Sequence, residues 1–74
     1  MKLTERQREA LEHIKEGKVH QRNYGYSAWR IGGPSSPTVV GRVISMKLAD
    51  WKRQDDEYIA FLTEAGEDAL QQPT

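Results

Sequence analysis

The chain has 74 residues, no cysteine and a formal net charge of zero. This length leaves room for one domain, since typical domains run to about 100–150 residues. The absence of cysteine excludes a disulfide framework and a thiolate metal site. Because 36% of the residues are hydrophobic and 30% charged, we expect a folded domain held together by packing. No apolar run suits a signal peptide or a membrane span, so the expected location is the cytoplasm, with no membrane partner.

Charge is unevenly spread along the chain. Residues 17–49 contain five basic and no acidic residues, whereas residues 54–74 contain six acidic and no basic residues. A chain polarised in this way can present a basic face although its overall charge is zero. The alternative is that the charges lie dispersed on solvated faces. The basic residues after position 17 are Lys18, Arg22, Arg30, Arg42, Lys47, Lys52 and Arg53.

Residues 5–16 have the signals of an amphipathic helix. Thr4 and Gln7 have the spacing of a capping box, in which each side chain bonds to the backbone N–H of the other residue. Gly17 suits the left-handed position that ends a helix. Apolar residues recur between these signals at helical spacing, at Ala10, Leu11 and Ile14. The sequence therefore predicts a helix over 5–16.

Residues 18–31 favour strands. A turn signal at 23–25 separates two short runs that are rich in Tyr, Trp, Val and Ile. Trp29 and Ile31 alternate with Arg30, so a half-buried strand would turn both apolar side chains inward. We expect a hairpin here, and a short helix around 25–31 is the alternative.

A second helix is expected after the loop at 32–36. Ser36 suits the N-cap and Pro37 the first helical position, where its missing N–H costs nothing. Apolar residues then recur in one stripe, at Val40, Val43, Ile44, Leu48 and Trp51. We predict a helix over 37–49. Gly41 within it costs about 0.5–1 kcal/mol relative to alanine, which suggests that another backbone or a ligand approaches closely there.

Residues 51–62 predict a two-stranded ribbon with an acidic tip at 55–57. The second strand is apolar on both faces, because its apolar run is continuous while side chains alternate. Thr63 then suits the cap of a short helix whose acidic first turns complement the helix dipole. The expected fold class is α+β, a single domain over 1–74: helix, hairpin or short helix, second helix, ribbon and short C-terminal helix.

Two segments resemble MarR-type regulators, which are winged helix-turn-helix proteins. Residues 36–44, Ser-Pro-Thr-Val-Val-Gly-Arg-Val-Ile, resemble the start of their recognition helix. Residues 61–70, Phe-Leu-Thr-Glu-Ala-Gly-Glu-Asp-Ala-Leu, resemble the stretch after their wing, and the Leu-Thr-Glu-Arg-Gln opening at 3–7 adds to the likeness. The order of elements is also that of a winged helix. The chain departs from the family at 18–31, where the family has a short helix, and it has no room for the family's long dimerisation helices.

The resemblance implies a transcriptional regulator that binds specific double-stranded DNA. The helix over 37–49 would enter the major groove and the ribbon over 51–62 would act as the wing. Thr38, Arg42 and Ser45 would meet base edges, with Val39 or Met46 against a thymine methyl group. Backbone contacts would come from Lys52 and Arg53, with Arg22, Arg30, Lys47, Tyr24 and Tyr26 in addition. A homodimer would let two such helices read paired half-sites.

No set of residues favours catalysis. His13 and His20 lack the spacing of a metal site, residues 32–34 lack the lysine of a phosphate-binding loop, and residues 55–57 are better explained as a solvated tip. We expect no enzyme activity, no metal and no cofactor. The competing hypothesis is a protein-binding module that resembles the accessory or inhibitor proteins of phages and mobile elements. Its partner would bind the acidic C-terminal third, at Glu64, Glu67 and Asp68.

Overall fold

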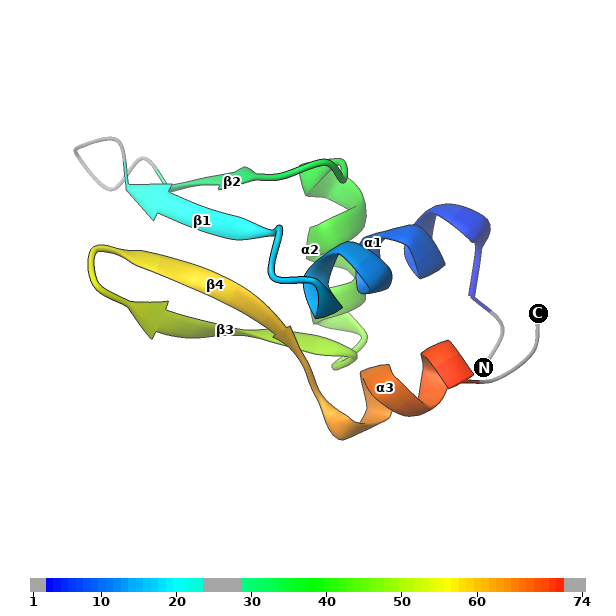
Figure 1. Ribbon diagram of the computed structural model, residues 1–74. Coiled ribbons are helices and arrows are strands. Elements are labelled where there is room, and N and C mark those ends of the chain that lie inside the picture. The colour runs from blue at the N-terminus through cyan, green and yellow to red at the C-terminus, as the bar shows by residue number, and fades with distance from the viewer. Residues whose placement is uncertain (1–2, 24–28, 72–74) are drawn as a thin grey trace.

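A computed structural model describes residues 3–23 and 29–71, and this part of the chain folds into three helices and a four-stranded antiparallel sheet. The elements follow in the order α1 (Glu5–Lys15), β1 (His20–Asn23), β2 (Trp29–Gly32), α2 (Pro37–Ser45), β3 (Ala49–Gln54), β4 (Glu57–Leu62) and α3 (Glu64–Gln71). The helices gather at one end, and the two hairpins extend from it side by side (Figure 1). The α+β class expected from the sequence is confirmed. No helix of the described residues is long and apolar enough to cross a membrane.

The sheet has the strand order β2-β1-β4-β3, so the pairing of β1 with β4 joins the two hairpins. Residues directly opposite each other in antiparallel strands share a face, and the register therefore divides the side chains into two sets. The helix-side face has Ile31, Gln21, Tyr58, Ala60, Trp51 and Arg53. The outer face has Arg30, Arg22, His20, Ile59, Phe61 and Lys52.

The core lies between α1, α2 and the helix-side face of the sheet. Its largest fully buried side chains are Leu11, Ile14, Val19, Val40 and Val43. Burying an aliphatic side chain of this size stabilises the fold by about 1.5–3 kcal/mol. Ala49 and Ala60 close the core from the sheet, and Ile31, Trp51 and Leu62 pack against it half-buried. The apolar stripes that the sequence predicted for the two helices both point into this core.

The predicted first helix is confirmed, with its end at Lys15 in place of residue 16. The capping box is formed: the Thr4 N–H donates to Gln7 Oε1 and the Gln7 N–H donates to Thr4 Oγ1, each over 3.1 Å. Gly17 follows the helix with a φ of 75°. The hairpin is also confirmed in its strands, because β1 and β2 pair antiparallel where a short helix was the alternative. Residues 24–28 lie outside the described residues.

The second helix is shorter than the predicted span over 37–49, because α2 ends at Ser45. Lys47 adopts a φ of 66°. Its N–H donates to the Ile44 carbonyl over 3.0 Å and the Leu48 N–H donates to the Val43 carbonyl over 3.1 Å, the two bonds of a Schellman motif. Leu48 and Trp51 still join the core, but they reach it from a turn and from β3. The continued apolar spacing therefore overstated the helix.

The turn after α2 is held by the start of α3. Thr63 Oγ1 donates to the Lys47 carbonyl over 2.7 Å and accepts from the Gly66 N–H over 3.1 Å, as its predicted cap position requires. The Thr63 N–H donates to the Leu48 carbonyl over 3.1 Å. Gly66 is buried directly against that carbonyl. At the other end of α3, Arg8 donates from Nη1 to the Leu70 carbonyl over 2.9 Å, which ties α1 to α3.

Replacement of Gly66 by alanine should strongly destabilise the protein. A Cβ at this position would lie 1.9 Å from the Leu48 carbonyl oxygen, so backbone must move. Overpacking of this kind costs about 1–3 kcal/mol, and we expect a loss of at least about 2 kcal/mol in the free energy of unfolding, measured by urea titration. Ala65→Ser, at the exposed neighbouring position, is the control and should change stability by less than about 0.5 kcal/mol. Equal stability of Gly66→Ala and the unmodified protein would contradict the close packing.

Candidate nucleic-acid interface

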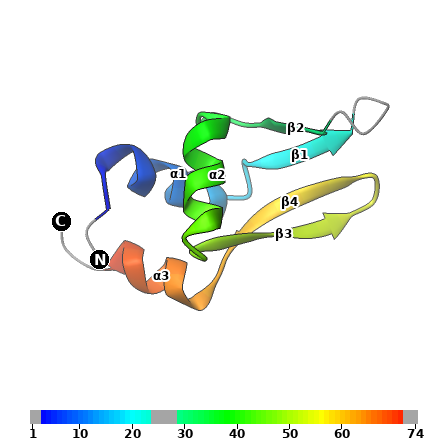
Figure 2. The same cartoon turned by 180° about the vertical axis from the view of Figure 1, so that it is seen from behind.

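The outward flank of α2 consists of Thr38, Arg42 and Ser45, which are all exposed. They share one side of the helix because they follow at intervals of four and three residues. The opposite side holds Val40 and Val43 in the core, and this packing turns the flank away from α1. Figure 2 shows α2 in front of α1, at the base of both hairpins. The three residues that the sequence assigned to base contacts therefore form one solvated surface.

Val39 does not share this flank. It is half-buried and lines an open pocket between α1 and the loop before α2. The other lining residues are Arg6, Glu9, His13, Pro34, Ser35 and Ser36. Met46, the other residue expected to meet a thymine methyl group, is half-buried at the C-cap of α2 and packs against the core.

The cations of the sheet are divided between its two faces. Lys52 and Arg53 are consecutive in β3, so their side chains leave the strand on opposite sides. Arg53 lies on the helix-side face, opposite Tyr58, whereas Lys52 lies on the outer face, opposite Ile59. Arg22, also on the outer face, forms an ion pair with Glu57 of β4. The sheet therefore does not gather these cations into one continuous basic face.

Arg30 and Lys47 flank the two ends of α2. Arg30 is exposed in β2, the edge strand beside the start of α2. It lines a recess together with Gln21, Ile31 and Pro37. Lys47 is exposed in the turn after α2. Sequence reasoning did not single out Gln21, because no pattern marks a glutamine that only the sheet register brings beside α2. Tyr24 and Tyr26 lie outside the described residues.

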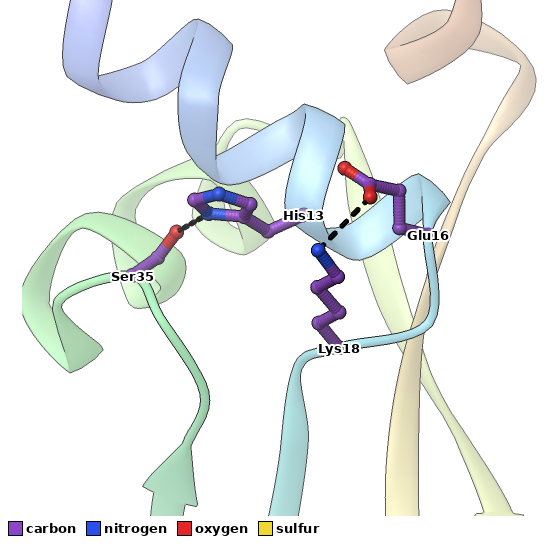
Figure 3. A network of polar contacts seen from close by, with 4 residues as sticks. All are labelled: His13, Glu16, Lys18 and Ser35. Carbon is purple, nitrogen blue, oxygen red and sulfur yellow. Dashed lines mark hydrogen bonds and ion pairs between the residues drawn. The ribbon is translucent and has the colours of Figure 1, made fainter.

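One side-chain hydrogen bond ties α1 to the loop that leads into α2. His13 Nδ1 and Ser35 Oγ are 2.7 Å apart (Figure 3). The same view shows Lys18 paired with Glu16 at 3.1 Å, an exposed ion pair in the turn after α1. A surface pair of this kind contributes about 0–1 kcal/mol. The His13 bond joins α1 to the residue directly before the N-cap of α2.

The end of β4 and the helix α3 that follows it have a different chemistry. Phe61 is the large hydrophobic side chain that the described surface exposes, with 43% of its area accessible. Glu64, Glu67 and Asp68 follow on α3 and are all exposed. Among the described residues no group of three or more histidine or carboxylate side chains is placed to hold a metal ion.

Comparison of the chain with known protein families, curated proteins and solved structures found no match.

Replacement of Ser35 by alanine should weaken the connection between α1 and α2. A hydrogen bond of this kind contributes about 0.5–1.5 kcal/mol, so we expect a loss of about 1 kcal/mol in the free energy of unfolding, measured by urea titration. The neighbouring Ser36 occupies the N-cap of α2 but makes no side-chain capping bond. Ser36→Ala is therefore the matched control, with a change of less than about 0.5 kcal/mol. The reverse ranking of the two variants would contradict the role given to His13.

Proposed function

We propose that this domain is a winged-helix variant that binds double-stranded DNA, with α2 as the recognition helix and the β3–β4 ribbon as the wing. The order α1, β1, α2, β3, β4 supports the fold assignment. In this variant β2 stands where MarR-type proteins have a short helix before the recognition helix. The helix α2 would make the sequence-specific contacts, and these contacts would give the protein a role in transcriptional regulation.

The single observation that supports this function best is the solvated flank of α2. The nine residues of α2 span about 13 Å at 1.5 Å per residue. This length suits the major groove, which is about 12 Å wide. Arg42 lies at the middle of the flank and has the guanidinium geometry that reads the O6 and N7 atoms of guanine. Thr38 and Ser45 supply hydroxyl groups one turn to either side.

The charge around α2 also favours a DNA backbone. Residues 17–49 contain no aspartate or glutamate, so no side chain of β1, β2 or α2 would repel a phosphate group. On the wing, Asp55 and Asp56 form an acidic tip, which would repel phosphate. The wing contact therefore falls to Arg53, which shares the helix-side face with α2, and Lys52 on the outer face has a lesser part.

Replacement of Arg42 by alanine should weaken DNA binding without unfolding the protein. Loss of one good base contact costs about 1–3 kcal/mol, which is about 5- to 150-fold in the dissociation constant. We would measure it by fluorescence anisotropy on duplexes selected from a mixed-sequence pool. Lys18→Ala is the control, since it removes the same charge from a lysine already paired with Glu16. Absence of binding by the unmodified protein at low salt, or equal binding by the Arg42 variant, would refute the proposal.

A second candidate function is binding of a protein partner through Phe61 and α3. The observation that favours it is the exposed Phe61 beside the acidic residues Glu64, Glu67 and Asp68. An aromatic anchor with charges around it is a common composition for a protein interface, and the acidic side chains would select a basic partner.

The two candidates are separated by a second set of variants. Joint neutralisation by Glu64→Gln, Glu67→Gln and Asp68→Asn, or the single change Phe61→Ser, should abolish co-purification of a specific basic protein and leave duplex binding within about threefold. The Arg42→Ala protein should show the opposite pattern, with the partner retained and the duplex lost. Loss of duplex binding in the α3 variants would place the acidic surface within the DNA site and contradict the separation of the two surfaces.

A further inference from the structure

The recess beside α2 differs from the rest of the proposed interface because three elements, β1, β2 and α2, form it. Gln21 and Ile31 come from the helix-side face of the β1–β2 hairpin, and Pro37 comes from the first turn of α2. Arg30 belongs to the outer face of the edge strand β2 and lines the recess at this open edge of the sheet. Gln21 is half-buried and Arg30 is exposed. The recess therefore combines an amide and a guanidinium group, both of which donate hydrogen bonds to phosphate oxygens.

Gly41 lies on the same side of α2 as Pro37, one turn further along, since the two are four residues apart. A Cβ built on Gly41 would meet no atom within 4 Å beyond its own helix. Internal packing therefore does not explain a glycine at this position, although it lowers the stability of the helix. By contrast, Gly66 is held against the Leu48 carbonyl. The space over Gly41 is open to another molecule.

The recess also has a favourable charge. Arg30 forms no ion pair with a carboxylate in the described part of the chain, whereas Arg22, which lies directly opposite it on the same face of the sheet, is paired with Glu57. Gln21 lies opposite Tyr58 in β4, so its cross-strand neighbour is not a carboxylate either. An unpaired guanidinium group and an amide group beside an uncovered side of a helix suit phosphate better than other classes of ligand.

We infer that this recess is the contact site for a backbone phosphate of the bound duplex, held by Arg30 and Gln21, and that Gly41 lets the sugar-phosphate backbone approach α2 closely. This inference rests on the proposed function and adds to it the place where the DNA backbone contacts the protein. The β1–β2 hairpin, which departs from the family pattern, thereby gains a part in DNA binding. Arg42 reads bases from the outward flank, while the backbone passes on the side of α2 that faces the hairpin.

The first test replaces Gly41 by alanine. Because the added methyl group meets open space in the free protein and improves helix propensity, the melting temperature should rise by about 2–8 °C. The same methyl group would fill the space for the backbone, so duplex affinity should fall by about tenfold. A variant that is both more stable and weaker in binding cannot be explained by misfolding. A more stable variant with unchanged duplex affinity would overturn the inference.

The second test replaces Arg30 by alanine and follows duplex affinity over a range of salt concentrations. Each phosphate contact contributes about 0.9 to the slope of log affinity against log salt, so the slope should become shallower by about that amount. Gln21→Ala should weaken binding and leave the slope unchanged, because it removes a neutral donor. Lys18→Ala, from the lysine paired with Glu16, is the control and should leave both quantities near their original values.

The outcomes distinguish this inference from the function on which it rests. If the unmodified protein fails to bind duplex DNA at low salt, the proposed function fails. If it binds, and Arg42→Ala weakens binding while the Gly41 and Arg30 variants behave like the unmodified protein, the function stands and the recess is not a phosphate site. Loss of affinity in the Gly41 and Arg30 variants, with the shallower slope for Arg30, supports the inference.

Discussion

The structure depends on the packing of α2 against α1, because this contact decides which side of α2 meets solvent. Val40 and Val43 are fully buried in the same cluster as Leu11 and Ile14. A chain this short has few other large apolar residues from which to build a core. With that side of α2 fixed, Arg42 is held outward, and the side with Pro37 and Gly41 turns toward the β1–β2 hairpin.

The close approach of α3 to the turn after α2 gives residues 63–66 a part in the fold. Thr63 bonds to Lys47 and caps α3, and Gly66 provides the room that the Leu48 carbonyl needs. Thr63 and Gly66 therefore stabilise the fold. Gly41 in α2 differs from Gly66, because no packing contact in the fold requires a glycine at this position. Packing within the fold therefore explains Gly66, whereas we assign Gly41 to binding.

The strand β2 has consequences beyond its four residues. It forms an edge of the sheet beside the start of α2, where a short helix stands in the family that the sequence resembles. The sheet therefore reaches from one end of α2 to the other, with β2 near its start and β3 after its end. This arrangement puts Arg30 near the start of α2, while Phe61 lies on the outer face of the central strand β4.

The sequence by itself determined the local elements: the capped first helix, the hairpin, the proline-started second helix and the acidic ribbon tip, because capping, turn and periodicity signals act over a few residues. It also predicted that Thr38, Arg42 and Ser45 would share a side of α2. Only the tertiary structure decided where α2 ends, since the apolar spacing through Leu48 and Trp51 fits a helix and a turn followed by a strand equally well. The register likewise decided that Arg53 lies on the helix-side face opposite Tyr58, that Lys52 lies on the outer face opposite Ile59, and that Gln21 lies opposite Ile31. Such placements depend on strand pairing between distant segments, and local periodicity holds no information about that pairing.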